Sequence, residues 1–191
     1  MLKDLVLKNR SYRGYDPARK VTREELASFV DCARLSPSSV NAQPLKYYLA
    51  SSGEDASKLQ PLTKWAAALP DITLPHPGKY PPAFIVICQD TEISDAPARF
   101  LRDVGIAAQT ILLAAAEAGL GGCMIGNFDA RAVSEALHLK DTLRPMLLVA
   151  IGKPDETVVL TDVETGGSVQ YYRDENDVHY VPKRRLEDII L

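Results

Sequence analysis

A long alanine-rich segment, residues 97–118, constrains the fold of this chain more than any other feature of its sequence. Apolar side chains recur in it at helical spacing: Phe100, Val104, Ala107, Ala108, Ile111, Leu112 and Ala115. The second half is apolar around much of its circumference, which is typical of a helix covered on two sides. We expect this helix to lie at the centre of the fold or against a partner subunit, and to end at Gly119 and Gly121-Gly122. If a partner helix covers it, small residues such as Ala108 are expected to be exposed on the single chain.

The remaining pattern mixes helices with short buried strands. Thr22 and Glu25 form a capping box that predicts a helix to about Arg34. Other helices are expected at 2–9 and 129–137, with a terminal turn of helix near 186–190. Strands are expected at 45–51, 83–89 and 146–151, a short apolar segment at 123–125, and a hairpin or strand pair around 173–177. No repeat or linker divides the chain, so we expect one α+β domain over residues 1–191. Residues 54–82, a weak helix over 56–69 followed by several prolines, are expected to be a lid or insertion.

Composition excludes several classes of partner. The 191 residues carry 22 Lys and Arg against 25 Asp and Glu, a formal charge of −3, which does not favour nucleic acid. The longest apolar stretch, 111–116, is too short to span a membrane, and the N-terminus lacks the apolar core of a signal peptide. We therefore expect a soluble, cytoplasmic protein whose partners are small molecules or proteins.

Familiar catalytic motifs are absent. The glycines at 119–126 leave a helix and enter a strand, the reverse of a dinucleotide fingerprint, and no P-loop occurs. Cys32, Cys88 and Cys123 have no metal or disulfide spacing. The three histidines, at 76, 138 and 179, are scattered, which favours surface or structural roles over a zinc site. The serines near position 38 lack the context of a hydrolase nucleophile.

Three polar clusters remain, each lying just outside a predicted element. Arg10-Ser11-Tyr12-Arg13 is either an anion site or a solvated turn. The loop from Ser36 to Pro44 holds hydroxyls and amides between two prolines that restrict it, although such residues are common in loops. Lys183-Arg184-Arg185 is either a third anion-binding group or an ordinary basic tail.

The order of these clusters resembles the FMN-dependent nitroreductase family. The most specific segments are RSYR at 10–13, ARLSPSSVNAQP at 33–44, and DVGIAAQ at 103–109 leading into AAEAGLGGCMIG. The resemblance spans Arg10 to Leu191 and implies an α+β fold with a central, mostly antiparallel sheet flanked by helices. It also implies an interlocked homodimer with two FMN sites at its interface.

The resemblance assigns a role to individual residues. Arg10, Ser11 and Arg13 would contact the phosphate, ribityl and pyrimidine side of FMN, and Lys183 with Arg184 or Arg185 would close on the phosphate. The loop that reaches the flavin, supplied largely by the other subunit, would consist of Pro37, Ser38, Ser39, Asn41 and Gln43. Ile125 and Gly126 would bring backbone N–H groups near flavin N5. Many family members have a basic residue where this chain has Asn9, so phosphate binding is expected to depend more on Lys183 to Arg185.

The implied activity is reduction of a nitroaromatic, a quinone or a similar small acceptor by NADH or NADPH in a ping-pong reaction. The flavin would carry the hydride chemistry, so no catalytic side chain and no metal are expected. In the lid, Trp65, His76 and Tyr80 are candidates for substrate contact, with Trp65 equally a core anchor. The alternatives are a flavin-binding module without NAD(P)H turnover, a flavin-dependent dehalogenase of similar fold, and a flavin-free α+β binding protein.

Overall fold

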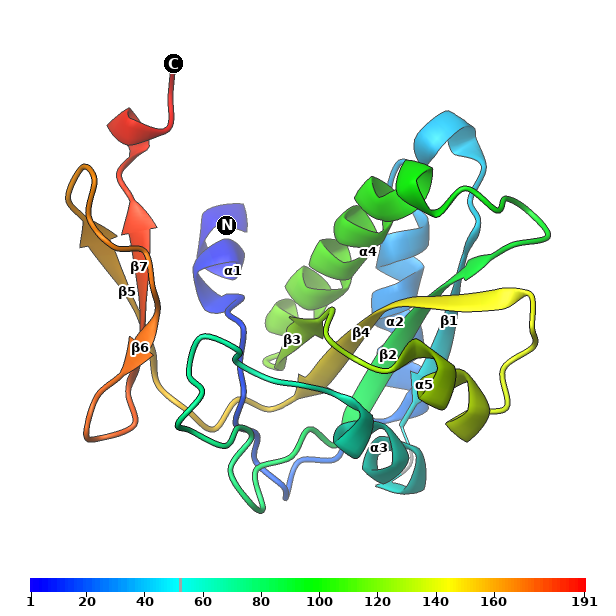
Figure 1. The fold of residues 1–191 in the computed structure, drawn as a ribbon, viewed down its shortest axis with the longest axis horizontal. Helices are drawn as coiled ribbons and strands as arrows, with labels where there is room; N and C mark the ends of the chain where they lie inside the picture. Colours follow the sequence, from blue (N-terminus) through cyan, green and yellow to red (C-terminus); the bar gives the residue numbers. More distant parts are fainter. Residues whose placement is uncertain (52) are drawn as a thin grey trace.

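A four-stranded antiparallel sheet forms the centre of the molecule (Figure 1). The computed structural model describes residues 1–51 and 53–191. The strand order is β1-β2-β4-β3, with bounds β1 Leu45–Ala50, β2 Ala83–Asp90, β3 Gly121–Ile125 and β4 Leu143–Gly152. The three strands expected from apolar runs are confirmed, and the short segment at 123–125 is the body of β3.

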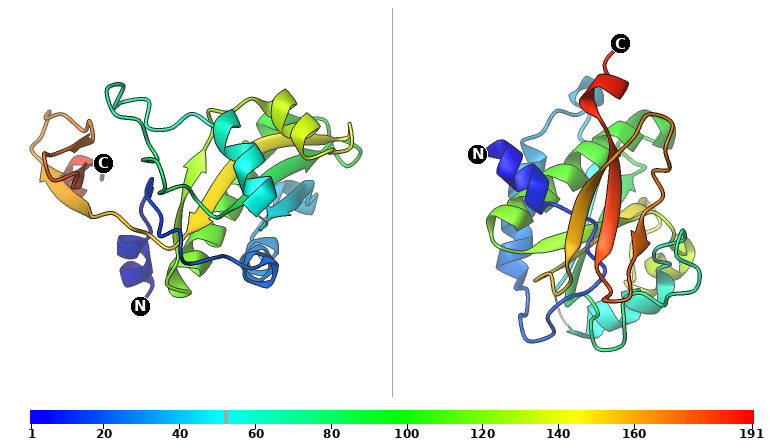
Figure 2. Two further views of the ribbon diagram at one scale, coloured as in Figure 1. Left: turned by 90° about the horizontal axis from the view of Figure 1, so that it is seen from below. Right: turned by 90° about the vertical axis from the view of Figure 1, so that its left-hand side faces the viewer.

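Helices cover both faces of this sheet. The helices α2 (Arg23–Arg34) and α4 (Pro97–Glu117) pack together over one face, and α3 (Gly53–Leu59) and α5 (Ala130–Ala136) over the other (Figures 1 and 2). Ile85 and Ile87 of β2 enter the first core while Phe84 and Val86 enter the second. A strand buried on both faces needs apolar residues at successive positions, which explains the apolar run of β2.

Local signals predicted the helices well. Thr22 Oγ1 accepts from the Glu25 N–H, and the Glu25 carboxylate accepts from the Thr22 N–H, so the capping box forms as expected. Asp129 caps α5 through the Ala132 N–H. The first helix is α1, Leu2–Lys8. In the lid the prediction of a helix to residue 69 is wrong: the helical part is α3 and a 3-10 turn, Gln60–Leu62, and an irregular chain follows.

The expectation that α4 packs on more than one side is confirmed, but the expected exposure of one of its residues is wrong. Ala108 was expected to lie exposed on a single chain and available to a partner, and it is 0% exposed within this chain's own core. The large apolar side chains that are exposed on α4 are Leu101 and Ile106. The spacing of alanines cannot distinguish a face buried against α2 from one left for a partner.

The C-terminal segment forms a second, three-stranded sheet of order β5-β7-β6, with bounds β5 Val158–Val163, β6 Tyr172–Arg173 and β7 His179–Arg184. The antiparallel pairing of β6 with β7 confirms the expected hairpin, and the parallel pairing of β5 with β7 was not predicted. Figure 1 shows this small sheet at one end of the molecule, beyond α1. A 3-10 turn, Leu186–Asp188, follows it, and none of the helices that the structure describes is long and apolar enough to cross a membrane.

Candidate functional site

Residues 10–13, which we call the arginine turn, lie across the beginning of β3. Ser11 makes a parallel bridge to Gly122, and the Tyr12 N–H donates to the Gly122 carbonyl at 3.0 Å. The Tyr12 ring covers Gly121, where a Cβ would lie 2.6 Å from Tyr12 Cδ2. Glycine is therefore required at position 121 because the Tyr12 ring leaves no room for a Cβ. At position 119 the reason is different: the backbone has a φ of +75° where α4 ends, a conformation that favours glycine.

Both ends of the chain meet at a cavity of about 260 Å³. We call it the cationic cavity; its lining residues are Asn9, Arg10, Ser11, Arg13, Tyr171, His179, Val181 and Lys183. Three of these side chains are cations and none is acidic. In a chain whose formal charge is −3, this is a local concentration of positive charge suited to an anion.

Arg13 is held rigidly in the wall of the cationic cavity. It is 9% exposed, its Nη1 donates to the Ser11 carbonyl at 3.1 Å, and its guanidinium lies 5.0 Å from the centroid of the Tyr171 ring. The Arg13 backbone N–H donates to Glu156. This carboxylate also pairs with Arg173, and the two side chains are 5% and 2% exposed. A buried ion pair thus fixes the backbone beside the cavity.

Several polar atoms of the cavity wall have no partner among the described residues. They are Arg10 Nε and both ring nitrogens of His179. Burial, together with the charges of Arg13 and Arg173, lowers the pKa of His179 to about 4, so its imidazole is neutral near pH 7. These buried N–H groups lie beside three cationic side chains and could donate hydrogen bonds to the oxygens of a phosphate.

The alternation of β7 determines which C-terminal residues reach the cavity. His179, Val181 and Lys183 occupy every second position and share one face, whereas Arg184 does not line the cavity. Arg185 pairs instead with Glu164. From the sequence, His179 was expected to have a surface or structural role. The period-two spacing of His179 and Lys183 in a strand was the signal that could have placed both residues on the same face.

The loop of residues 37–43 lies elsewhere, at the N-terminal part of α4. Ser38 Oγ donates to Asp103 Oδ2 at 2.6 Å, and the Ser39 N–H donates to the same oxygen at 2.9 Å. The Gln43 side chain donates to Asn41 Oδ1 at 3.2 Å, and both residues have positive φ, as has Val40. Pro37, Ser38 and Gln43 border a separate cavity of about 240 Å³, which shares no lining residue with the cationic cavity.

The end of β3 is bordered by the lid. Ile125 is buried and Gly126 is exposed. Immediately after them, the Asn127 carbonyl accepts from the Lys64 N–H at 2.8 Å, and Thr63 bridges to Phe128. Of the three lid residues named as substrate contacts, Trp65 and Tyr80 border one large cavity, while His76 Nε2 lies 3.0 Å from Asp177 Oδ2 and does not line it.

Comparisons with known proteins agree with this architecture. The model of the nitroreductase family matches residues 6–153, and this match ends before the C-terminal segment that supplies His179 and Lys183. A Bacillus subtilis protein named as a proposed NAD(P)H nitroreductase, YdgI, is 28% identical over 178 residues, covering 75% of this chain and 84% of its own. An Archaeoglobus fulgidus protein named as a proposed NADH dehydrogenase or NAD(P)H nitroreductase is 27% identical, covering 97% of this chain and 94% of its own.

Solved structures share the fold. A nitroreductase family protein from Streptococcus pneumoniae superposes with a TM-score of 0.68 at 21% identity, covering 100% of this chain and 99% of its own. A protein from Exiguobacterium sibiricum, named as a proposed nitroreductase and solved with FMN, gives 0.67 at 23% identity, covering 82% of this chain and 89% of its own. The family resemblance drawn from the sequence is therefore confirmed, and the relatives' names agree with the expectation of an NAD(P)H-dependent oxidoreductase. This chain belongs to the nitroreductase family.

Proposed function

We propose that the protein is an FMN-dependent oxidoreductase that uses NAD(P)H to reduce a nitroaromatic, a quinone or a similar small acceptor. One observation supports this most directly: Arg10, Arg13 and Lys183, from opposite ends of the chain, converge on one cavity together with buried donors that have no partner among the residues the structure describes. A dianionic phosphate fits this set of donors chemically. Family membership and the FMN bound to the Exiguobacterium protein point to the same ligand.

Each residue of the cationic cavity has a definable task toward the phosphate end of FMN. Arg10 offers its Nε, which has no hydrogen-bond partner in the described part of the chain, Lys183 offers an ammonium, and Ser11 offers a hydroxyl. Arg13, fixed by Tyr171 and by the backbone bond to Glu156, supplies a positive charge that does not move. Of the basic tail, Lys183 lines the cationic cavity, whereas Arg184 and Arg185 do not, and Arg185 pairs with Glu164, so we assign the tail's phosphate contact to Lys183.

The size of the cationic cavity supports a site shared between two chains. Cavities that enclose drug-sized ligands measure about 300–1,000 Å³, whereas this one measures about 260 Å³ and so suits only part of an FMN molecule. Of the remaining flavin contacts named from the sequence, Pro37, Ser38 and Gln43 border a different cavity of the same chain. A second chain would bring its loop to the exposed part of the flavin, with Ile125 and Gly126 beside the ring.

Exposed apolar side chains support the same homodimer. The helix α1 buries no residue within the chain, and Leu2, Val6 and Leu7 are exposed on it. Further exposed apolar residues lie on α4 and in the C-terminal turn: Leu101, Ile106, Leu186, Ile189 and Ile190. Apolar side chains exposed on two helices and a terminal arm are typical of surfaces that a partner covers.

When bound, FMN supplies the redox chemistry by accepting electrons from NAD(P)H and donating them to the acceptor. The protein's own residues bind the phosphate, and Arg13 places a fixed positive charge beside the cofactor. No side-chain base is required. The relatives' names support NAD(P)H as the donor, and the absence of a dinucleotide fingerprint favours an open, shared site for the nicotinamide.

The purified protein provides the test. We expect mass analysis of the denatured supernatant to show FMN, and NADH or NADPH to bleach the flavin absorption in the absence of oxygen. A panel of nitroaromatics, quinones and halogenated phenols then identifies the acceptor. Failure to release or take up FMN contradicts the proposal; bound FMN that neither nicotinamide reduces identifies a flavin-binding module instead.

A further inference from the structure

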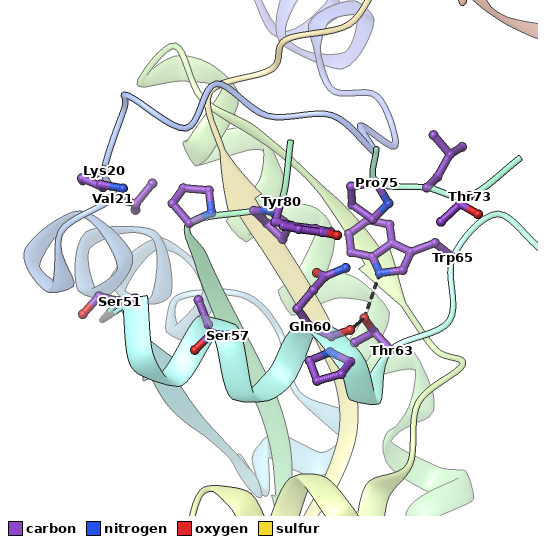
Figure 3. A pocket seen from close by; sticks show the side chains of 16 residues that line it. Lys20, Val21, Ser51, Ser57, Gln60, Thr63, Trp65, Thr73, Pro75 and Tyr80 are labelled. Carbon is purple, nitrogen blue, oxygen red and sulfur yellow. Dashed lines mark hydrogen bonds between the residues drawn. The ribbon is translucent and has the colours of Figure 1, made fainter. Parts of the chain in front are cut away.

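A cavity of about 600 Å³ lies between α3 and residues 73–82 of the lid (Figure 3). We call it the lid cavity. It is more than twice the volume of the cationic cavity and falls within the range of about 300–1,000 Å³ that encloses small organic ligands. The structure thus contains a second cavity, partly open to solvent and outside the flavin contacts, that is large enough for a ligand.

The walls of the lid cavity are apolar and conformationally restricted. Pro75, Pro81 and Pro82 form part of one wall, and proline has little conformational freedom to lose when a ligand binds. In Figure 3, Trp65, Pro75 and Tyr80 gather at one end of the cavity. This end presents aromatic ring surfaces to whatever enters.

Hydrogen bonds fix the orientation of the Trp65 indole. Its Nε1–H donates to Thr63 Oγ1 at 2.8 Å, and the Thr63 hydroxyl donates to the Gln60 carbonyl at 2.7 Å. The indole N–H is therefore already satisfied, so only the ring of Trp65 is available to a ligand. A planar aromatic molecule is the chemical class that packs best against such a surface.

The amide of Gln60 provides the polar contact. Its Oε1 is buried and accepts no hydrogen bond from any residue that the structure describes, although the residue lines the cavity. A buried acceptor without a donor costs free energy, and a ligand O–H or N–H placed there would recover it. The sole charged residue among the lining side chains is Lys20, which Figure 3 shows far from Trp65, so the aromatic end favours an uncharged ligand.

The lid cavity is separate from the residues assigned to the flavin. None of the described residues that line it is one of them, and neither Ile125 nor Gly126 is among its lining residues. We propose that the lid cavity is a second small-molecule site, which binds a neutral planar aromatic with its ring against Trp65 and Tyr80 and one O–H or N–H donor on Gln60 Oε1. This proposal goes beyond the flavin chemistry and does not depend on it.

Trp65 makes the proposal directly measurable because it is the only tryptophan in the chain. The probe is p-cresol, a neutral phenol that absorbs where tyrosine does, so tryptophan can be excited selectively at the red edge of its absorption. We expect p-cresol to change the Trp65 emission saturably. Its methyl ether, p-methylanisole, lacks the donor and should bind about 3–10-fold more weakly, the worth of one neutral hydrogen bond. A non-saturable change, or equal affinity for the two compounds, overturns the proposal.

A variant at position 60 tests the contribution of the Gln60 amide to binding. Gln60→Leu keeps a side chain of similar size without the acceptor, and we expect it to bind p-cresol no better than p-methylanisole. Gln170→Leu, at an exposed position outside the cavity, is the matched control and should keep the preference for p-cresol. A preference that survives in Gln60→Leu excludes Gln60 from the site.

The flavin absorption spectrum shows whether the phenol binds in the lid cavity or against the flavin. A phenol that stacks on oxidised flavin produces a new long-wavelength charge-transfer absorption, whereas a phenol in the lid cavity leaves the flavin spectrum unchanged. We expect no such absorption when Trp65 is saturated; its appearance in parallel with the Trp65 change overturns the separate site. If the protein carries no flavin, the proposed function fails, while the Trp65 titration still decides whether the lid cavity binds.

Discussion

Ser38 Oγ donates a 2.6 Å hydrogen bond to Asp103 Oδ2, which ties the loop of residues 37–43 to the core helix α4. The Ser39 N–H donates to the same oxygen, and Asp103 is 6% exposed. Ser38 Oγ in turn accepts from the Gln43 N–H at 3.0 Å. A single buried carboxylate therefore orders a loop that contains three residues of positive φ.

Replacing Asp103 by Asn is expected to loosen this loop. The amide has one acceptor oxygen and no charge, so the free energy of unfolding should fall by about 1.5–3 kcal/mol, the range for a hydrogen bond to a charged group. FMN retention should fall as well. Urea denaturation and FMN titration measure the two effects, with Asp141→Asn at an exposed position as control. If both quantities match the wild type, Asp103 does not organise the loop.

Arg10→Ala is expected to weaken FMN binding more than Arg99→Ala does. Arg10 lines the cationic cavity with an Nε that bonds to no described residue, whereas Arg99 is an exposed residue of α4. Loss of a charge-assisted donor to phosphate costs about 1.5–3 kcal/mol, or about 10–150-fold in the dissociation constant. Riboflavin, which lacks the phosphate, should lose far less. Equal FMN dissociation constants for the two variants would remove Arg10 from the site.

Local signals predicted most elements of the main sheet and its helices. The Thr22–Glu25 capping box and the apolar run of β2 depend on neighbours in sequence, so both appear where expected. The strand β5 was missed although its sequence, VVLTDV, is rich in β-branched residues. Its parallel pairing with β7 was not predictable, because a local pattern can indicate a strand but does not identify the strand's partner.

The candidate site was predictable in part for the same reason. The clusters at 10–13 and 183–185 are visible in the sequence, and Lys183 does reach the arginines. The contributions of His179 and Tyr171, and the pairing of Arg185 with Glu164, depend on how the C-terminal arm folds back. The exposure of Ala108 was predicted wrongly because helix periodicity does not say what covers each face.

The proposed dimer is tested on α4 at a side chain that is exposed in the single chain. Ile106 is 41% exposed, so Ile106→Glu should fold normally while placing a charge in the proposed interface. Light scattering should show less dimer, and FMN occupancy should fall with it, since the loop of residues 37–43 would come from the partner. Ile93→Glu, an exposed apolar position in the turn after β2, is the control. A monomer that keeps full FMN and full NAD(P)H oxidation contradicts the shared site.

The buried imidazole predicts how stability depends on pH. Burial and the charges of Arg13 and Arg173 lower the pKa of His179 to about 4, and Asp177 opposes this effect. In the unfolded chain the imidazole of His179 has a pKa of about 6.5, so between about pH 6.5 and pH 4 it is protonated in the unfolded state but not in the folded state. The free energy of unfolding therefore falls as the pH drops through this range, by at most about 1.4 kcal/mol per pH unit.

His179→Phe is expected to flatten this part of the pH profile, while His138→Asn retains it. Inorganic phosphate should also reduce the slope in the wild type, because an anion in the cationic cavity favours the imidazolium. Urea denaturation at several pH values, with and without phosphate, provides the measurement. Identical slopes for the wild type and His179→Phe would show that His179 does not carry the effect.

Two ion pairs of the C-terminal region are expected to differ sharply in their contribution to stability. Glu156 pairs with Arg173 where both side chains are buried, and it also accepts from the Arg13 N–H. Glu156→Gln leaves the Arg173 guanidinium buried with Asp177 as its one remaining carboxylate partner among the described residues, and loss of one member of a buried pair costs about 3–5 kcal/mol. Glu164, 78% exposed, pairs with Arg185, and Glu164→Gln should cost at most about 1 kcal/mol. Urea denaturation of the two variants compares the same chemical change in both environments, and equal losses would mean that the Glu156–Arg173 pair does not anchor the arginine turn.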